Sequence, residues 1–114
     1  MPADSSEATA QAASPCEPFA AAVGITGASP TTARAAFPRG LFQPAGGFRF
    51  GSDALLLAAL AAGLPGTRAV DLGTGCGAAG LGYLLATAET AATVLGLDRE
   101  AAMVAAAQQN AATL

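Results

Sequence analysis

Three glycines alternate with other residues directly after a short apolar run that contains an acid. Residues 70–77 read Val-Asp-Leu-Gly-Thr-Gly-Cys-Gly, and a helical pattern of apolar residues follows them. Glycine has no Cβ and adopts positive φ without strain, so such a loop lets the backbone approach a ligand closely. Asp71 just before the glycines would repel a pyrophosphate and attract an amine or sugar hydroxyls. The pattern therefore predicts a nucleotide or nucleoside site, with Asp71 selecting against phosphate.

Residues 71–77 resemble motif I of the Rossmann-like methyltransferases that use S-adenosylmethionine, in which the acid and the glycines cradle the methionine part of the cofactor. Residues 94–98, Val-Leu-Gly-Leu-Asp, resemble the second strand of that fold, whose terminal acid takes the two ribose hydroxyls. Asp98 lies 21 positions after Gly77, and about 20 are expected between a glycine loop and a ribose acid. The resemblance implies S-adenosylmethionine as the cofactor and the cofactor-binding set Asp71, Gly73, Thr74, Gly75, Gly77, Asp98, Phe50 and Asp53.

A longer segment upstream narrows the resemblance. Residues 43–59 are similar to the segment before motif I in bacterial methyltransferases that modify adenine N6 of valine tRNA. This similarity implies methylation of an amino nitrogen of a tRNA adenine, although relatives that modify ribosomal RNA bases or a release-factor glutamine share the cofactor half. It alone suggests that Phe50 and Asp53 close over the cofactor, since packing and helix capping also explain both residues.

The resemblance covers residues 41–114, and the motif that carries out catalysis in this family is not among them. That motif is Asn-Pro-Pro-Tyr or a close variant, and none of the seven prolines is adjacent to another. We therefore assign no catalytic residue and expect no methyl transfer by this chain alone. Net charge is −3, so a tRNA or other RNA substrate is expected to bind mostly outside this chain.

Two other kinds of function stay open. Residues 75–80 also match the Gly-x-Gly-x-x-Gly pattern of an NAD-binding Rossmann domain, although Asp71 would be unfavourable next to a pyrophosphate. The chain could instead be a non-catalytic module that binds the cofactor or a partner, with a partner chain completing its sheet, because an open strand edge invites pairing.

The order of elements predicts an α/β fold, namely the N-terminal half of a doubly wound Rossmann-like methyltransferase sheet. Residues 1–38 are rich in Ala, Ser, Thr and Pro and are predicted to form a disordered tail, followed by a partial methyltransferase domain at 39–114. The expected elements are a hairpin at 41–50, a helix capped by Ser52 and ended by Gly63, strands at 68–72 and 94–98, and helices at 77–87 and 99–112.

Composition excludes several classes of site. The chain has no histidine, which rules out a Ser-His-Asp triad and most catalytic zinc sites. Its two cysteines, Cys16 and Cys76, have no metal or disulfide spacing, and Cys76 is interpreted as a small residue filling the loop rather than as a reactive thiol. With no histidine and no metal spacing, no metal is expected. No apolar run is long enough for a signal peptide or a membrane span, so no membrane is expected and the protein is placed in the cytoplasm.

Overall fold

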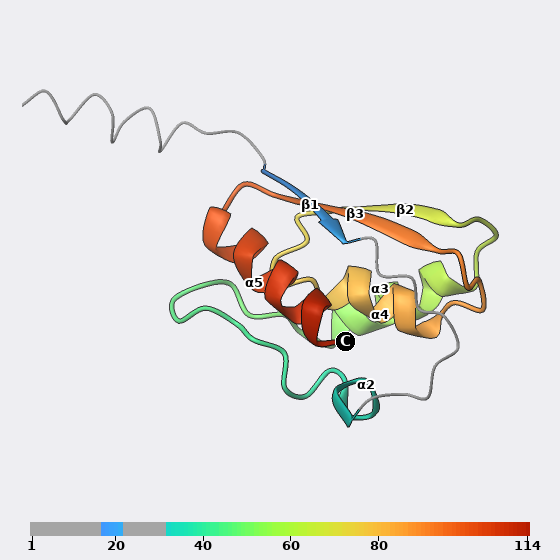
Figure 1. Cartoon of the computed structure of the whole chain (residues 1–114), viewed down its shortest axis with the longest axis horizontal. Coiled ribbons are helices and arrows are strands. Elements are labelled where there is room, and N and C mark those ends of the chain that lie inside the picture. The colour runs from blue at the N-terminus through green and yellow to red at the C-terminus, as the bar shows by residue number, and fades with distance from the viewer. Residues whose placement is uncertain (1–16, 22–31) are drawn as a thin grey trace, which may run out of the picture.

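The computed structural model describes residues 17–21 and 32–114. Strands and helices alternate through most of this part of the chain (Figure 1). In chain order the elements are β1 (Glu17–Ala21), α2 (Thr32–Ala36), α3 (Ser52–Ala62), β2 (Arg68–Leu72), α4 (Ala78–Ala86), β3 (Thr93–Asp98) and α5 (Ala101–Thr113).

The three strands form one sheet in the order β1-β3-β2. Strands β2 and β3 are parallel, with Val70 opposite Leu95 and Leu72 opposite Leu97. Helix α4 connects them, as a parallel pair requires, because only a crossover can return the chain to the same end of the sheet. The predicted α/β class with a parallel β-α-β unit is confirmed. Strand β1 adds to the other edge of β3 in the antiparallel sense.

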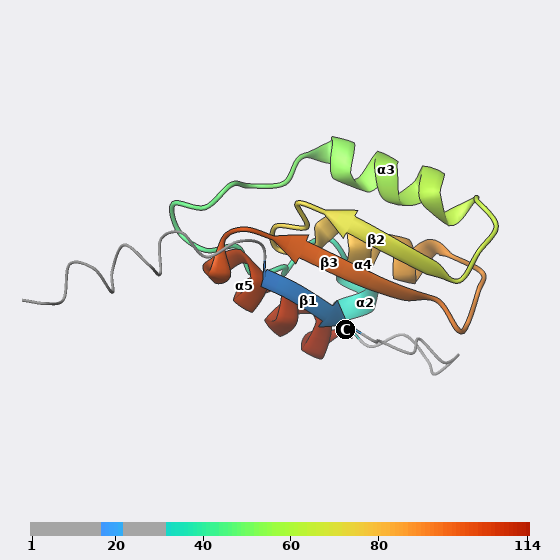
Figure 2. The same ribbon diagram turned by 90° about the horizontal axis from the view of Figure 1, so that it is seen from above.

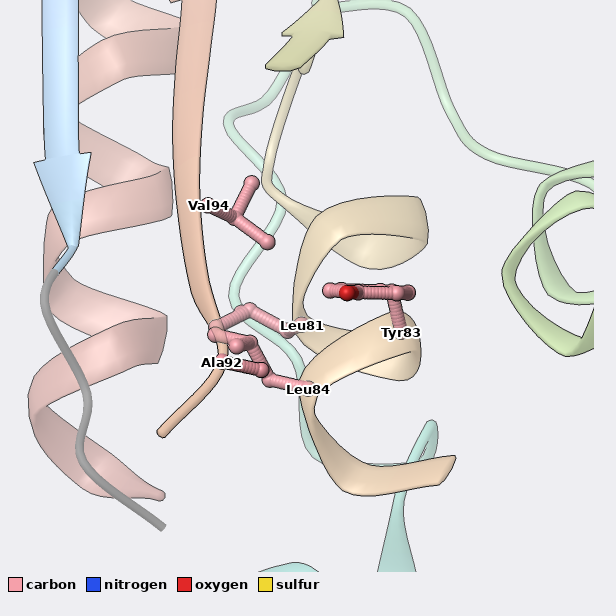
Figure 3. Packing of buried hydrophobic residues seen from close by; sticks show 5 residues of the cluster. All are labelled: Leu81, Tyr83, Leu84, Ala92 and Val94. Carbon is pink, nitrogen blue, oxygen red and sulfur yellow. The ribbon is translucent and has the colours of Figure 1, made fainter. Parts of the chain in front are cut away.

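Helices α3, α4 and α5 all lie on one side of the sheet (Figures 1 and 2). Helix α4 brings Leu81, Tyr83 and Leu84 against Ala92 and Val94, and these five residues form the largest buried cluster (Figure 3). Helix α3 packs closely on α4 at Gly82, where an added Cβ would stand 3.0 Å from the Cβ of Ala58. Leu81 and Leu84 are buried, and Leu85 is half-buried.

The opposite face of the sheet carries apolar side chains that nothing covers in the described residues. Val70 is 60% exposed, Leu72 77% and Leu95 39%. Strand β2 also pairs on one edge only within the sheet as described. Parallel sheets are normally covered on both faces, so this face is the surface that most departs from an ordinary α/β domain.

Several local predictions are wrong or shifted. Residues 41–50 form a loop with a turn from Pro44 to Gly47 rather than a hairpin. Ser52 is inside α3, whose N-cap is Gly51, and makes no cap hydrogen bond. Helix α5 begins two residues later than expected because the Asp98 carboxylate holds the amide of Glu100 in a turn at 2.9 Å.

The predicted tail contains two short elements, β1 and α2. The rest of the segment to residue 31, with Cys16, lies outside the described residues. No helix in the described ranges has both the length and the apolar character to cross a membrane.

Candidate ligand-binding site

The glycine loop follows the carboxyl end of β2 and has the backbone conformation that its sequence predicts. Gly73, Gly75 and Gly77 have φ of 73°, 57° and 91°, a left-handed conformation that side chains with a Cβ rarely adopt. The loop is fastened to the end of β3, because the amides of Gly73 and Thr74 both donate to the carbonyl of Leu97 at 2.8 Å. The carboxyl ends of the two parallel strands thus meet at one edge of the sheet.

Asp98 reaches from the end of β3 into this loop. Its Oδ2 accepts a hydrogen bond from the amide of Gly75 at 2.8 Å, and its Oδ1 accepts one from Glu100 at 2.9 Å. Two residues that the sequence analysis assigned to the cofactor are therefore in direct contact. Asp98 also holds the turn before α5, and each carboxylate oxygen keeps acceptor capacity for a further donor.

Asp71 points toward the start of α4. Its Oδ2 accepts from the Thr74 hydroxyl at 2.8 Å and from the amide of Gly80 at 3.0 Å. Gly80 is in the first turn of α4, where amides have no partner within the helix. An added Cβ on Gly80 would stand 3.1 Å from the same oxygen, so glycine permits this approach. A carboxylate therefore already sits at the positive end of the α4 dipole.

A cavity of about 660 Å³ opens beside the loop. One wall consists of Gly73, Gly75, Asp98, Arg99, Glu100, Ala102 and Met103, and the other wall consists of residues 44–48. We call these the glycine wall and the 44–48 wall. The volume is within the range of small-molecule sites, roughly 300–1,000 Å³.

A second cavity of about 210 Å³ also borders the glycine loop. It is lined by four more of the predicted residues, Phe50, Asp53, Asp71 and Thr74, and again by Gly73 and Gly75. Gly77 lines neither cavity. An added Cβ there would stand 3.2 Å from Leu81 and 3.4 Å from Ala107, so glycine at this position lets the end of the loop lie close to α5.

Two residues of α5 contribute to the site although they were not predicted from the sequence. Met103 is buried and lies close to both walls, with its Sδ 3.2 Å from the position of a Cβ on Gly47 and its Cε 3.6 Å from one on Gly75. Asn110 is hydrogen-bonded to the backbone of Phe42 and Cys76. The two glutamines that precede Asn110 carry the same amide group and are exposed, so the sequence did not single out Asn110, and nothing in the sequence placed Met103 near Gly47.

Cys76 is buried, with 2% of its surface exposed. Burial raises the pKa of its thiol, and hydrogen bonds from the backbone amides of Ala78 and Cys76 oppose the rise. A thiol with a raised pKa has less thiolate at neutral pH and reacts slowly. This agrees with the interpretation of Cys76 as a packing residue. No group of three or more potential metal ligands occurs in residues 17–21 and 32–114.

A scan against protein-family models, a search of curated proteins and a search of solved structures each found no match to this chain.

Proposed function

We propose that this chain binds S-adenosylmethionine and is the cofactor-binding part of a methyltransferase. The observation that carries the proposal is the Asp71 carboxylate at the first turn of α4, hydrogen-bonded to Gly80. In a dinucleotide-binding domain the pyrophosphate occupies that position at a helix N-terminus. A carboxylate there repels phosphate and favours a ligand with positive charge and no phosphate. S-adenosylmethionine fits this requirement, and NAD does not.

The proposed roles follow from position. Asp98, at the rim of the larger cavity, would accept hydrogen bonds from the two ribose hydroxyls while still holding Gly75. Asp71 lines the second cavity, where it would face the ammonium group of the ligand. Gly73 lines both cavities, so the ligand would pass close to its backbone. Phe50 and Asp53 line the same second cavity and would close over the ligand. The bound cofactor would supply an activated methyl group.

The proposed methyl acceptor is an amino nitrogen of a tRNA adenine, on the resemblance of residues 43–59 alone. The groups that would activate such a nitrogen in the Asn-Pro-Pro-Tyr motif are not in the sequence, and the net charge is −3. Both facts favour the proposal that this chain supplies the cofactor-binding part, and that polypeptide outside it supplies the RNA-binding and catalytic groups.

The uncovered sheet face supports this division and also keeps a second candidate function in view, a module that pairs with a partner. Val70 and Leu72 on this face are more than half exposed, and so are Leu57 and Leu60 of α3, which lies on the other side of the sheet (Figure 1). An unpaired parallel edge beside apolar surface is what further strands and helices cover. We infer that the sheet belongs to a larger, doubly wound sheet in the working protein.

Thermal unfolding of the purified full chain with different ligands tests the proposal. At a concentration of 100 times Kd, a ligand specific for the native state adds about 2.7 kcal/mol, which raises Tm by roughly 10 °C or more in a domain of this size. We expect this shift with S-adenosylhomocysteine and S-adenosylmethionine and none with NADH. Protection by NADH without protection by S-adenosylhomocysteine would reverse the assignment.

A further inference from the structure

One buried amide side chain connects the two walls of the larger cavity without lining the cavity itself. Asn110 is on the buried side of α5, with 4% of its surface exposed. Its Oδ1 accepts a hydrogen bond from the amide of Phe42 at 2.7 Å, and its Nδ2 donates to the carbonyl of Phe42 at 3.0 Å. The side chain thus pairs with Phe42 as a neighbouring strand would.

The third hydrogen bond of Asn110 goes to a different segment. Its Nδ2 also donates to the carbonyl of Cys76 at 2.9 Å, in a buried position. Cys76 follows directly on the glycine wall, and Phe42 is two residues before the 44–48 wall. Both hydrogens of the amide and its oxygen are therefore used, and every bond ends on backbone that leads into one of the two walls.

We propose that Asn110 is a positioning residue that holds the glycine wall and the 44–48 wall at a fixed separation, and so determines how tightly the cavity binds its adenosine-containing ligand. The affinity part of this inference rests on the proposed function. Met103 supports the same arrangement from the cavity side, because it lies beneath Gly47 and Gly75. Preorganised walls bind more tightly because no ordering is needed when the ligand enters.

The chemistry of the amide explains why another residue would not serve. Asparagine has an acceptor and two donor hydrogens in one plane, which matches one amide and two carbonyls. An ionised aspartate at 110 would keep the bond from Phe42 and present negative charge to both carbonyls. Alanine would leave the carbonyl of Cys76 buried without a partner and would remove the side-chain partner of both backbone groups of Phe42.

Hydrogen exchange of the full chain without ligand tests the positioning role directly. In Asn110→Asp and Asn110→Ala, we expect exchange to become at least tenfold faster in residues 42–48 and 74–77, with β2 and β3 unchanged. Gln108→Ala, an exposed change on the same helix, is the matched control and should leave all these rates unchanged. A uniform increase over the whole domain would mean that Asn110 serves general stability only, and no increase at the walls would also overturn the proposal.

Calorimetric titration with S-adenosylhomocysteine then tests the effect on affinity, at a temperature where each variant is folded. We expect Kd to rise about tenfold or more in Asn110→Asp and to stay within twofold in Gln108→Ala. If the alanine variant does not fold, the aspartate variant and Asn110→Ser carry the comparison. A wild-type chain that fails to bind S-adenosylhomocysteine would refute the proposed function, whereas unchanged affinity in variants with loosened walls would refute the role of Asn110.

Discussion

Replacing Asp98 by asparagine should separate ligand binding from folding. The Asp98 carboxylate accepts hydrogen bonds from the amides of Gly75 and Glu100 at 2.8 and 2.9 Å. Asparagine has one acceptor oxygen, so it keeps one of these bonds and turns an NH2 group toward the other amide. Hydrogen bonds to a charged group contribute about 1.5–3 kcal/mol, so a loss of about 2 kcal/mol of stability is expected.

The same change should weaken binding further, because one of two acceptors for the ribose hydroxyls disappears and the charge is lost. A further loss of about 2 kcal/mol corresponds to roughly a thirtyfold increase in Kd for S-adenosylhomocysteine. The assay is calorimetric titration of folded protein, with urea unfolding to measure stability separately. Glu89→Gln, which changes an exposed acid outside both cavities, is the control.

Two outcomes would refute this reasoning. If Asp98→Asn binds S-adenosylhomocysteine within twofold of the wild type, then Asp98 only organises the turn before α5. If Glu89→Gln weakens binding as much as Asp98→Asn, the effect is general electrostatics and not contact with the ribose.

Three further predictions concern the glycine loop, the buried thiol and the open face. Gly73→Ala should cost about 1–2 kcal/mol of stability because φ is 73°, and it should also weaken ligand binding. The control is Gly40→Ala, with φ of 87° and open space around it, which should show a similar loss of stability in urea unfolding without affecting binding. The raised pKa of Cys76 should make stability fall as pH rises above about 8.5, since the thiol ionises more readily in the unfolded chain. Urea unfolding at pH 7 and 9.5 should show a smaller decrease in stability for Cys76→Ala than for the wild type, and equal decreases would contradict this prediction. Leu72→Thr should change stability by less than about 0.5 kcal/mol, because Leu72 is 77% exposed. It should also reduce binding of an apolar fluorescent dye, and unchanged dye fluorescence would mean that the uncovered face of the sheet is not the dye site.

Strands β2 and β3 and the glycine loop were predictable because their signals are local. An apolar run followed by alternating glycines predicts a strand and a left-handed loop, and parallel strand ends meet at one edge of the sheet, which brings Asp98 to Gly75. Gly77 matched the same motif but packs against Leu81 and Ala107 instead of lining a cavity. Motif membership thus indicated the loop correctly without giving the role of each glycine.

The hairpin expected at 41–50 was wrong for a reason that no local pattern contains. The backbone groups of Phe42, which would have paired with a second strand, bond to the side chain of Asn110, 68 positions away. The 44–48 wall begins two residues after this long-range contact, so its position beside the glycine loop could not be predicted from spacing. Strand β1 was missed similarly, since its pairing with β3 depends on a distant edge.

Titration of the isotopically labelled full chain with S-adenosylhomocysteine, followed by amide NMR, is the most direct test of the proposed site. We expect shifts concentrated in residues 44–48, 73–76 and 98–103, with Gly75 and Asp98 among the largest, and no matching response to NADH. Absence of shifts at millimolar ligand, or shifts confined to residues outside both cavities, would contradict it.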